Sequence, residues 1–559
     1  MTSIIWPRVS GAGALFKANM GRLREMLART MVSATWAAVL LGIASLASRF
    51  LGVLRDRLLS GTFGAGPELD AYYAAFRAPD FMFGLFVSGA ISAGFIPVFT
   101  RYVLKDGNGR LGQSANEFAS RVISVLGLAL AVFSAVGAAT AHWFVPLYTA
   151  GFLPEYQQVA VQLTRIMFLS PFFLGLSAVF SGILQTYKRF TVYSLAPVVY
   201  NIGIIAGILL LTNQFSIYGV AVGVVIGSFL HMAIQFWSVL QLGFRFSFLP
   251  SLMDRGLREI GRMMGPRTAS LALEQANLIL LTGVASTLGV GSVAVFNLAF
   301  NLQSLPVGVL GVSFAVASFP FIAELADRGD RAGVKREFSR IVRTVLYLIV
   351  PATIIFLLLR AQIVRVILGT GNFDWGNTED TANALALFSV SLIAQALLPF
   401  IVKTFFAFRN VRVPLMVVTV SVIFERLLAW SLVRHGMDVS GLVLAYSASA
   451  ALRIVLLWVF LHLLVGDLDE KRIVRSLSVI VGAGLAMGIA MQGVKILVGN
   501  VVDMHSFLGV FGQGVAAGIV GLAVYVTVTY LLGNEEARRL TGILRRRFST
   551  VKVGEIEQI

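Results

Sequence analysis

The chain has 559 residues, of which 57% are hydrophobic and only 13% charged, and its mean hydropathy is +0.83. A soluble protein of this size needs far more polar surface, and outer-membrane barrels alternate apolar with polar residues, so the long unbroken apolar runs predict an all-α, polytopic membrane protein. The net charge of +17 sits in short loops and tails, which is typical of membrane topology and not of nucleic-acid binding, and the lack of cysteine excludes disulfides, thiol catalysis and cysteine-ligated metals.

Apolar stretches of about twenty residues, the length that crosses a bilayer, recur along the whole chain. We expect fourteen membrane spans, near residues 33–53, 71–99, 122–147, 159–185, 192–212, 217–243, 267–288, 293–322, 341–359, 382–407, 413–433, 440–465, 475–498 and 507–532.

The charges of the loops test this count independently. Basic clusters occur in the even-numbered connections, whereas odd-numbered ones such as 212–216 and 288–292 have almost none. Because basic loops stay on the cytoplasmic side, we expect both the basic N-terminal tail, 1–32, and the basic C-terminal tail, 533–559, to be cytoplasmic. No cleavable signal peptide is apparent in the first of these tails.

The chain also repeats itself. The segment Thr62-Phe63-Gly64-Ala65-Gly66 returns about 220 residues later as Thr287-Leu288-Gly289-Val290-Gly291, and Thr149-Ala150-Gly151-Phe152 returns as Gly369-Thr370-Gly371-Asn372-Phe373. Matches in register over six spans predict two pseudo-symmetric six-helix bundles in parallel orientation. The predicted parts are a first bundle at 33–243, a cytoplasmic amphipathic linker at 244–266, a second bundle at 267–465 and two additional helices within 466–532.

Charged residues are concentrated in the first two spans, where each charge near the bilayer centre costs a few kcal/mol or more. A guanidinium group is permanently charged, and its fork matches phosphate oxygens, so arginines beside a cavity would neutralise a pyrophosphate. An internal network that only joins helices, pairing Arg55 with Asp70 and Arg77 with Asp80, is the alternative. The candidate substrate-binding residues are Arg49, Arg55, Asp56, Asp70 and Arg77.

Other polar residues in the spans are less specific. Hydrogen bonding between helices is the alternative to a cavity-lining role for each of them. The carboxylate of Glu425 is the candidate site for a coupling ion. Phosphate-binding loops, zinc-binding motifs, nucleophile elbows and histidine clusters are absent from the sequence, so we do not expect an enzyme or a metal site. The candidate cavity residues are Glu274, Asn297, Asn301 and Ser304.

Several strings resemble the MurJ/MviN lipid II flippases of bacterial murein synthesis, which belong to the multidrug/oligosaccharidyl-lipid/polysaccharide exporter superfamily with a MATE-like fold. They are 48–56 (SRFLGVLRD), 64–66 (GAG), 70–72 (DAY), 77–80 (RAPD) and 306–312 (PVGVLGV). The resemblance implies a V-shaped pair of six-helix bundles in which Arg49, Arg55 and Asp70 match positions tied to function. Two basic features common in the family are replaced here, by Phe83-Gly84 in the second span and by Asn301 and Ser304 in the eighth, so we expect a less basic cavity.

The resemblance implies a flippase in the bacterial plasma membrane that moves an undecaprenyl-pyrophosphate-linked peptidoglycan precursor, lipid II, from the inner to the outer leaflet by alternating access. Another polyprenyl-linked oligosaccharide, or drug/cation antiport, is the alternative within transport, and a scaffold for cell-wall synthesis enzymes is the alternative outside it. We expect no bound cofactor, with transport driven by the membrane potential, by a coupling cation (Na⁺ or H⁺), or by both. The expected partners are the lipid-linked glycan, the phospholipid membrane and cell-wall synthesis enzymes, without nucleic acid.

Overall fold

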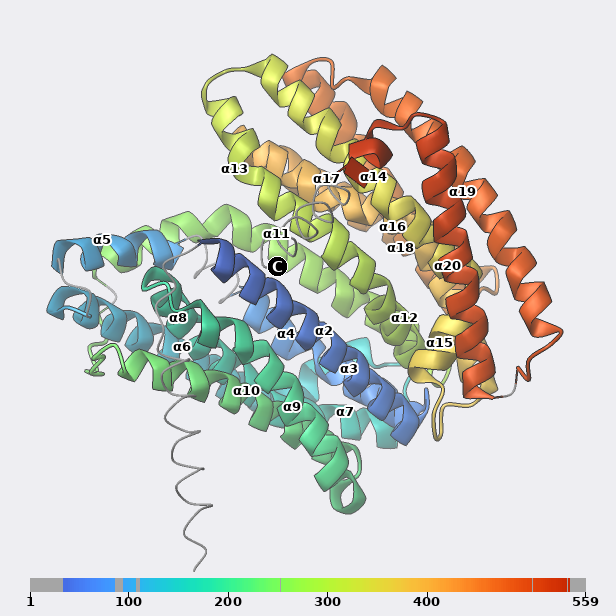
Figure 1. Cartoon of the computed structure of the whole chain (residues 1–559). Coiled ribbons are helices and arrows are strands. Elements are labelled where there is room, and N and C mark those ends of the chain that lie inside the picture. Colours follow the sequence, from blue (N-terminus) through green and yellow to red (C-terminus); the bar gives the residue numbers. More distant parts are fainter. Residues whose placement is uncertain are drawn as a thin grey trace, which may run out of the picture. The chain divides into compact units, whose positions relative to one another are not determined.

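The computed structural model describes residues 34–85, 94–106, 111–251, 253–504, 506–539 and 541–542. The regular structure of these residues is entirely helical (Figure 1). Eleven of the described helical segments are long and apolar enough to cross a membrane, which confirms the predicted all-α, polytopic class. The predicted tail 1–32 and residues 543–559 of the predicted C-terminal tail lie outside the described residues.

The three remaining predicted spans overlap described helices that are not among these eleven. Span 33–53 forms the first part of α2 (Ala34–Phe63), which runs on helically through Asp56. Span 71–99 is divided among α3 (Pro67–Ala75), α4 (Arg77–Phe83) and α5 (Ile96–Asp106). Span 267–288 lies in α11 (Arg255–Ser286), which contains the apolar stretch Leu271–Ser286.

The described chain forms two compact units. The first contains residues up to Arg55 together with Ala74–Leu147 and Pro154–Ala276, and the second contains Asp56–Tyr73, Tyr148–Leu153 and the chain from Asn277 onward. The division falls inside α2, directly after Arg55. The predicted division at the linker 244–266 stays a prediction, because the units follow packing and not chain order.

The first unit packs its helices around an aromatic core. Phe95, Phe99 and Phe118 are fully buried there, and Tyr102 stacks on Phe118 with ring centroids 4.4 Å apart. Besides parts of α2 and α11, the unit contains α4, α5, α6 (Gln113–Tyr148), α7 (Pro154–Met167), α8 (Leu169–Thr186), α9 (Phe190–Phe215) and α10 (Ile217–Leu240).

Helices α9 and α10 lie side by side because glycines remove the side chains between them (Figure 1). A Cβ on Gly203 would lie 2.3 Å from the Cα of Gly227, and one on Gly207 would lie 2.5 Å from the Cα of Gly223. Small residues at such spacing allow membrane helices to approach backbone to backbone, where dispersion replaces the hydrophobic effect. This contact fixes two of the helices that line the cavity described below.

The second unit contains parts of α2, α3 and α11, and then the remainder of the chain. Its core includes Phe338, Phe400 and Phe405, all fully buried. The elements are α12 (Ser292–Pro306), the π-helical turn η3 (Val307–Val312), α13 (Ser313–Asp327), α14 (Arg331–Leu358), α15 (Arg360–Leu368), α16 (Trp375–Ala407), α17 (Arg412–Arg434), α18 (Val439–Val465), α19 (Glu470–Gly499) and α20 (Phe507–Leu531).

Backbone geometry repeats where the sequence repeats. Lys188 and Arg409, in turns that the repeat places at corresponding positions, both adopt left-handed conformations, with φ of 56° and 57°. In each repeat, the motif that contains Gly64 or Gly289 has its glycine at positive φ and leads directly into a helix, α3 in one case and α12 in the other. A positive φ strains other residues, so the repeated glycines mark repeated turns.

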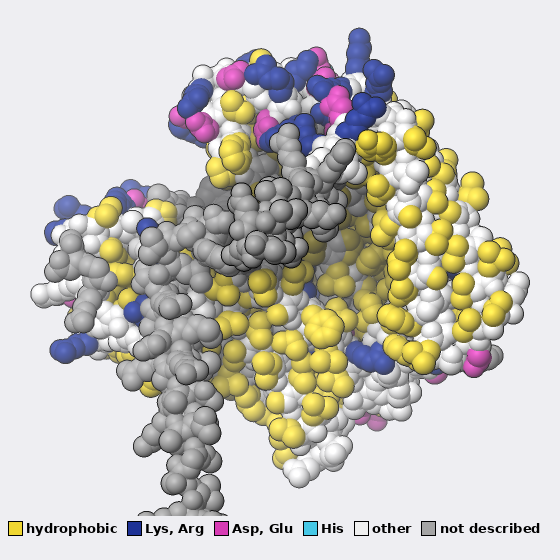
Figure 2. Space-filling model, viewed as in Figure 1, with side chains coloured by type: hydrophobic (Ala, Val, Ile, Leu, Met, Phe, Trp, Pro, Cys, Tyr) yellow, Lys and Arg dark blue, Asp and Glu magenta, His cyan; other side chains and the backbone are white. Residues whose placement is uncertain are grey.

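The surface of the second unit has the polarity of a membrane protein. Figure 2 shows hydrophobic side chains over α19 and α20 and charged side chains gathered at the end where α14 and α19 begin. Leu485 and Ile489 of α19 and Ile519 of α20 are all more than 60% exposed. Such a contiguous apolar face is stable only against lipid or another apolar surface.

Candidate functional site

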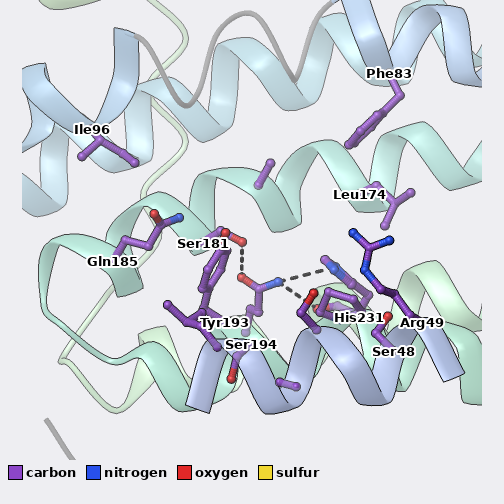
Figure 3. Close-up of a pocket in the computed structure, with 16 residues that line it drawn as sticks. Ser48, Arg49, Phe83, Ile96, Leu174, Ser181, Gln185, Tyr193, Ser194 and His231 are labelled. Carbon is purple, nitrogen blue, oxygen red and sulfur yellow. Dashed lines mark hydrogen bonds between the residues drawn. The ribbon is translucent and has the colours of Figure 1, made fainter. Parts of the chain in front are cut away.

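An open cavity with both polar and apolar lining residues lies within the first unit, bordered mainly by α2, α8, α9 and α10 (Figure 3). Its volume is about 770 Å³, which is the size of a small-molecule site. Hydroxyl, amide, phenol, imidazole and guanidinium groups line it, and no carboxylate does so in the described part of the chain. The polar lining residues are Ser45, Ser48, Arg49, Ser181, Gln185, Tyr193, Ser194, His231 and Gln235.

One face of α2 supplies the charged group. Residues 41, 44, 45, 48 and 49 all line the cavity, and this spacing is that of a single helical face. On the opposite face, Ile43, Leu46 and Phe50 are 59–69% exposed and apolar, as a lipid-facing surface requires. The amphipathic pattern of α2 therefore turns Arg49 toward the cavity.

Arg49 is the only Lys, Arg, Asp or Glu that lines this cavity among the described residues. Its guanidinium group is partly buried and forms no hydrogen bond or ion pair with any other residue that the structure describes. A permanently charged group in this setting attracts an anion, because no protein carboxylate there competes for it. The cavity therefore has the electrostatics of an anion-binding site.

Arg55 lies on the same helix but is not one of the residues that line the cavity. Its Nη1 donates to Oδ1 of Asn201 at 3.5 Å, and the Asn201 amide nitrogen donates to the carbonyl oxygen and hydroxyl of Ser48 at 3.3 and 3.2 Å. Asn201 belongs to α9, and its side chain contacts both Ser48 and Arg55, which lie near the two ends of the 48–56 motif. The structure thus separates Arg55 from Arg49 in this state.

Two other predicted residues meet in the second unit. Asn301 of α12 donates its amide proton to Oδ2 of buried Asp56 at 3.0 Å. Ser304 donates to the carbonyl oxygen of Asn301 at 2.7 Å, and Asn297 donates to that of Val293 at the same distance, so both bond within their own helix. Of these contacts, only the one between Asn301 and Asp56 joins two helices, α12 and α2, as the predicted alternative of hydrogen bonding between helices expects.

The remaining candidates of the first unit lie at surfaces. Glu274 is exposed on α11, and Arg77 is partly exposed as the first residue of α4. Arg77 interacts electrostatically with Asp80, as the ion-pair alternative expects. Their role in binding stays a prediction.

The side chain of Asp70 accepts hydrogen bonds at the start of another helix. The carboxylate, only 2% exposed, accepts hydrogen bonds from the backbone N–H groups of Gly291 at 2.6 Å and Ala294 at 2.7 Å. These donors belong to the first turn of α12, whose own N-cap residue, Gly291, has no side chain to satisfy them. Asp70 therefore caps a helix that follows it by more than 200 residues.

Replacing Asp70 by alanine is expected to lower the free energy of unfolding by about 2 kcal/mol, because two buried N–H groups lose a charged acceptor. Unfolding of the purified protein in detergent, followed by circular dichroism, measures this change. Glu68→Ala is the control, since Glu68 lies on the same helix and is only partly buried. Equal stability of the two variants would show that the cap contributes nothing.

Glu425, the candidate ion-binding residue, is 1% exposed and already has polar partners. The Asn277 amide nitrogen lies 3.2 Å from both of its oxygens, and Nη2 of Arg426 lies 3.4 Å from one of them. A second cavity, of about 110 Å³, adjoins this cluster and is lined by Ser449 and Arg453 among others. The cluster joins α11 and α17 and brings positive charge to the carboxylate.

The sequence did not single out the residues that give the first cavity its polar wall. His231 and Gln235 are four residues apart on α10, and Ser177 and Ser181 are four apart on α8. Polar residues repeated at i and i+4 within an apolar span are the signal that could have revealed them.

The helical architecture and a charged cavity within apolar helices define a multi-pass membrane transporter of the MATE-like fold. A solved structure described as lipid II flippase MurJ in an inward closed conformation has a TM-score of 0.73, at 22% identity over 88% of this chain and 98% of that one. An inward-facing MATE-family multidrug resistance transporter has a TM-score of 0.63, at 17% identity over 78% of this chain and 99% of that one. These likenesses show the fold.

The chain belongs to the lipid II flippase MurJ family, whose family model matches residues 59–512. A relative named lipid II flippase MurJ, from Burkholderia cenocepacia, is 28% identical over 433 residues, which cover 75% of this chain and 82% of the relative. The resemblance found in the sequence is confirmed. Because the family consists of transporters, the expectation that the chain is not an enzyme is confirmed as well.

Proposed function

We propose that this protein is a lipid II flippase, which moves the undecaprenyl-pyrophosphate-linked peptidoglycan precursor from the inner to the outer leaflet of a bacterial plasma membrane by alternating access. The observation that carries the proposal is the guanidinium group of Arg49, which has no carboxylate partner among the described residues, in a 770 Å³ cavity of a chain of this family. The diphosphate is the anionic part of such a substrate, and the polyprenyl chain stays in lipid.

The chemistry of the cavity favours this substrate over a cationic drug. A cation would have to enter beside Arg49 with no lining carboxylate, at a large electrostatic cost. A diphosphate, in contrast, loses its hydration on entry and regains charge-assisted hydrogen bonds from the guanidinium group. Serine, tyrosine and glutamine side chains nearby supply neutral donors for the remaining oxygens or for sugar hydroxyls.

Transport toward the outside is driven, in this proposal, by the membrane potential. An inside-negative potential favours outward movement of an anion by about 2.3 kcal/mol per charge per 100 mV. A coupling cation, Na⁺ or H⁺, belongs to the same proposal with Glu425 as its candidate site. The guanidinium group of Arg426 near that carboxylate favours the potential as the main driving force, since a cation would meet positive charge there.

Reconstitution tests the substrate and the driving force together. Proteoliposomes carry lipid II with a fluorescent headgroup, and a membrane-impermeant reagent bleaches the label that reaches the outer leaflet. We expect transfer that needs the protein, rises with an imposed potential and persists when sodium is replaced by choline. Transfer of another undecaprenyl-pyrophosphate oligosaccharide but not of lipid II, or transport of a cationic dye instead, would overturn the substrate assignment.

Two further parts of the proposal concern the cell. Both chain termini lie in the cytoplasm, which a protease added to sealed spheroplasts tests, because terminal tags would then be protected.

Association with cell-wall synthesis enzymes is expected from the place of the substrate in wall growth. Crosslinking in living cells tests this association, and recovery of no such enzyme would remove it from the proposal.

A further inference from the structure

A chain of hydrogen bonds crosses from α8 to α10 beside the cavity and ends at His231. Ser181 Oγ donates to Oε1 of Gln235 at 2.5 Å, and Nε2 of Gln235 donates to Ser177 Oγ at 2.8 Å. Ser177 Oγ in turn lies 2.8 Å from Nδ1 of His231. Ser177 and Gln235 are completely buried, so the chain is shielded from water.

The order of donors and acceptors favours one tautomer of the imidazole. Once Gln235 accepts from Ser181 through its oxygen, its nitrogen must donate to Ser177, which leaves the single Ser177 proton for another acceptor. That proton has two acceptors in reach, the His231 carbonyl oxygen at 3.2 Å and Nδ1 at 2.8 Å. Donation to the nearer Nδ1, which the amide nitrogen of Gln235 also approaches at 3.5 Å, places the ring proton on Nε2.

Nε2 is the atom of this network that is available to bind a ligand in the cavity. It has no hydrogen-bond partner among the residues that the structure describes, although His231 lines the same cavity as Arg49. The other polar atoms of this buried network have hydrogen-bond partners, and the one remaining donor lies at the cavity wall. Such a donor is positioned to form a hydrogen bond with a ligand in the cavity. The neighbouring lining residues bring no carboxylate to which this N–H could donate.

We propose that His231 binds the anionic passenger directly, donating its Nε2–H to a phosphate or diphosphate oxygen that Arg49 neutralises. This inference rests on the proposed function for the identity of the passenger, but not for the chemistry of the site. A neutral N–H donor adds a directed bond to the anion without adding a second charge to the apolar unit. Ser177 and Gln235 are positioning residues, because they hold the tautomer and do not touch the ligand.

Nitrogen-15 NMR of the full-length protein in lipid nanodiscs, labelled at histidine, tests the proposal directly. The chain has only five histidines, and the spectrum of His231→Gln assigns the signal of interest by difference. We expect an imidazole protonated at Nε2 whose Nε2 resonance shifts when inorganic pyrophosphate or geranylgeranyl pyrophosphate is added. Protonation at Nδ1 would leave Nε2 without a proton to donate and would overturn the proposal.

Binding of the same two probes to variants gives the second readout. His231→Leu removes the donor and is expected to weaken binding about tenfold, whereas His231→Gln places an amide N–H near the position of Nε2 and should stay within about threefold of the wild type. Gln235→Leu should weaken binding and also mix the two tautomers. His142→Gln is the matched control, because His142 is exposed, bonds to the carbonyl oxygen of Ala139 and lies beside the ring of Trp143, away from the cavity lining.

The outcomes separate this inference from the proposed function. Pyrophosphate binding that depends on His231, in a protein that does not move lipid II, would uphold the anion site and overturn the function. Normal lipid II transfer by His231→Leu, with no resonance shift on adding either probe, would overturn the inference alone. A shift with geranylgeranyl pyrophosphate but not with free pyrophosphate would uphold the inference and identify the ligand as a lipid headgroup.

Discussion

Arg49→Ala is expected to abolish lipid II transfer in proteoliposomes and to weaken pyrophosphate binding between tenfold and about a hundredfold. The reason is that Arg49 is the only Lys, Arg, Asp or Glu lining the described cavity, so its loss leaves a diphosphate without compensation in a low-dielectric setting. A charged hydrogen bond is worth about 1.5–3 kcal/mol, which corresponds to this range of affinity. Transfer rate and equilibrium binding measure the two effects separately.

Two variants control this experiment. Arg49→Lys keeps the charge but loses the fork that contacts two oxygens, so we expect partial binding and slow transfer. Arg101→Ala removes a surface arginine that is 60% exposed and paired with Glu259, and we expect it to transfer lipid II normally. If Arg49→Ala bound pyrophosphate as the wild type does, the anion-binding role of the cavity would be wrong.

The sequence was sufficient to predict the apolar span that forms the first part of α2. Ile43, Leu46 and Phe50 share one exposed, apolar face of this helix, and Arg49 lies about 100° around the helix from Phe50, outside that face. The repeat about 220 residues later predicted matching turns, and Lys188 and Arg409 share the same left-handed backbone. A periodic pattern and an internal repeat can both be recognised in a single sequence, because neither requires knowledge of which segments pack together.

The contacts between distant segments could not be predicted in this way. Asp70 was a candidate ligand for the substrate, yet its carboxylate caps α12, whose N–H groups come from Gly291 and Ala294. His231 was one of several scattered histidines, and its role becomes visible only when the glycines of α9 and α10 bring those helices together beside α8. A carboxylate or imidazole in a span signals a partner, but only packing identifies it.

The helices after the repeat, α19 and α20, have no counterpart in the first half, and the sequence did not predict what attaches them. A buried network joins them to α14. Nη1 of Arg343 pairs with Oε1 of Glu536 and lies 3.0 Å from Oε2 of Glu535, and both Arg343 and Glu536 are 3% exposed. Ser476 of α19 donates to Glu536 at 3.1 Å. Because this network includes a buried charge pair, removing one partner leaves the other uncompensated.

Arg472, near the start of α19, strengthens the same network at its exposed edge, where Glu535 lies beyond the end of α20. It lies 2.7 Å from Oε2 of Glu535 and holds the pKa of that carboxyl below its ordinary value of 4.5. A depressed folded-state pKa stabilises the ionised form, so this contribution is fully present above pH 4.5 and is lost as the pH falls through the folded-state value. Both residues are about half exposed, so the pair contributes little compared with the buried one.

Arg343→Met is therefore expected to lower the free energy of unfolding by about 3–5 kcal/mol, because Glu536 would remain buried without a cation. Detergent unfolding measures the loss, and limited proteolysis should show α19 and α20 cleaved first, since the network is one of the contacts that hold them against α14. Arg472→Gln, at the exposed edge, should cost less than about 1 kcal/mol. The double variant Arg343→Met, Glu536→Met should recover most of the stability, since replacing both partners removes the stranded charge. If the double variant were no more stable than Arg343→Met alone, the loss would come from packing and not from an uncompensated carboxylate.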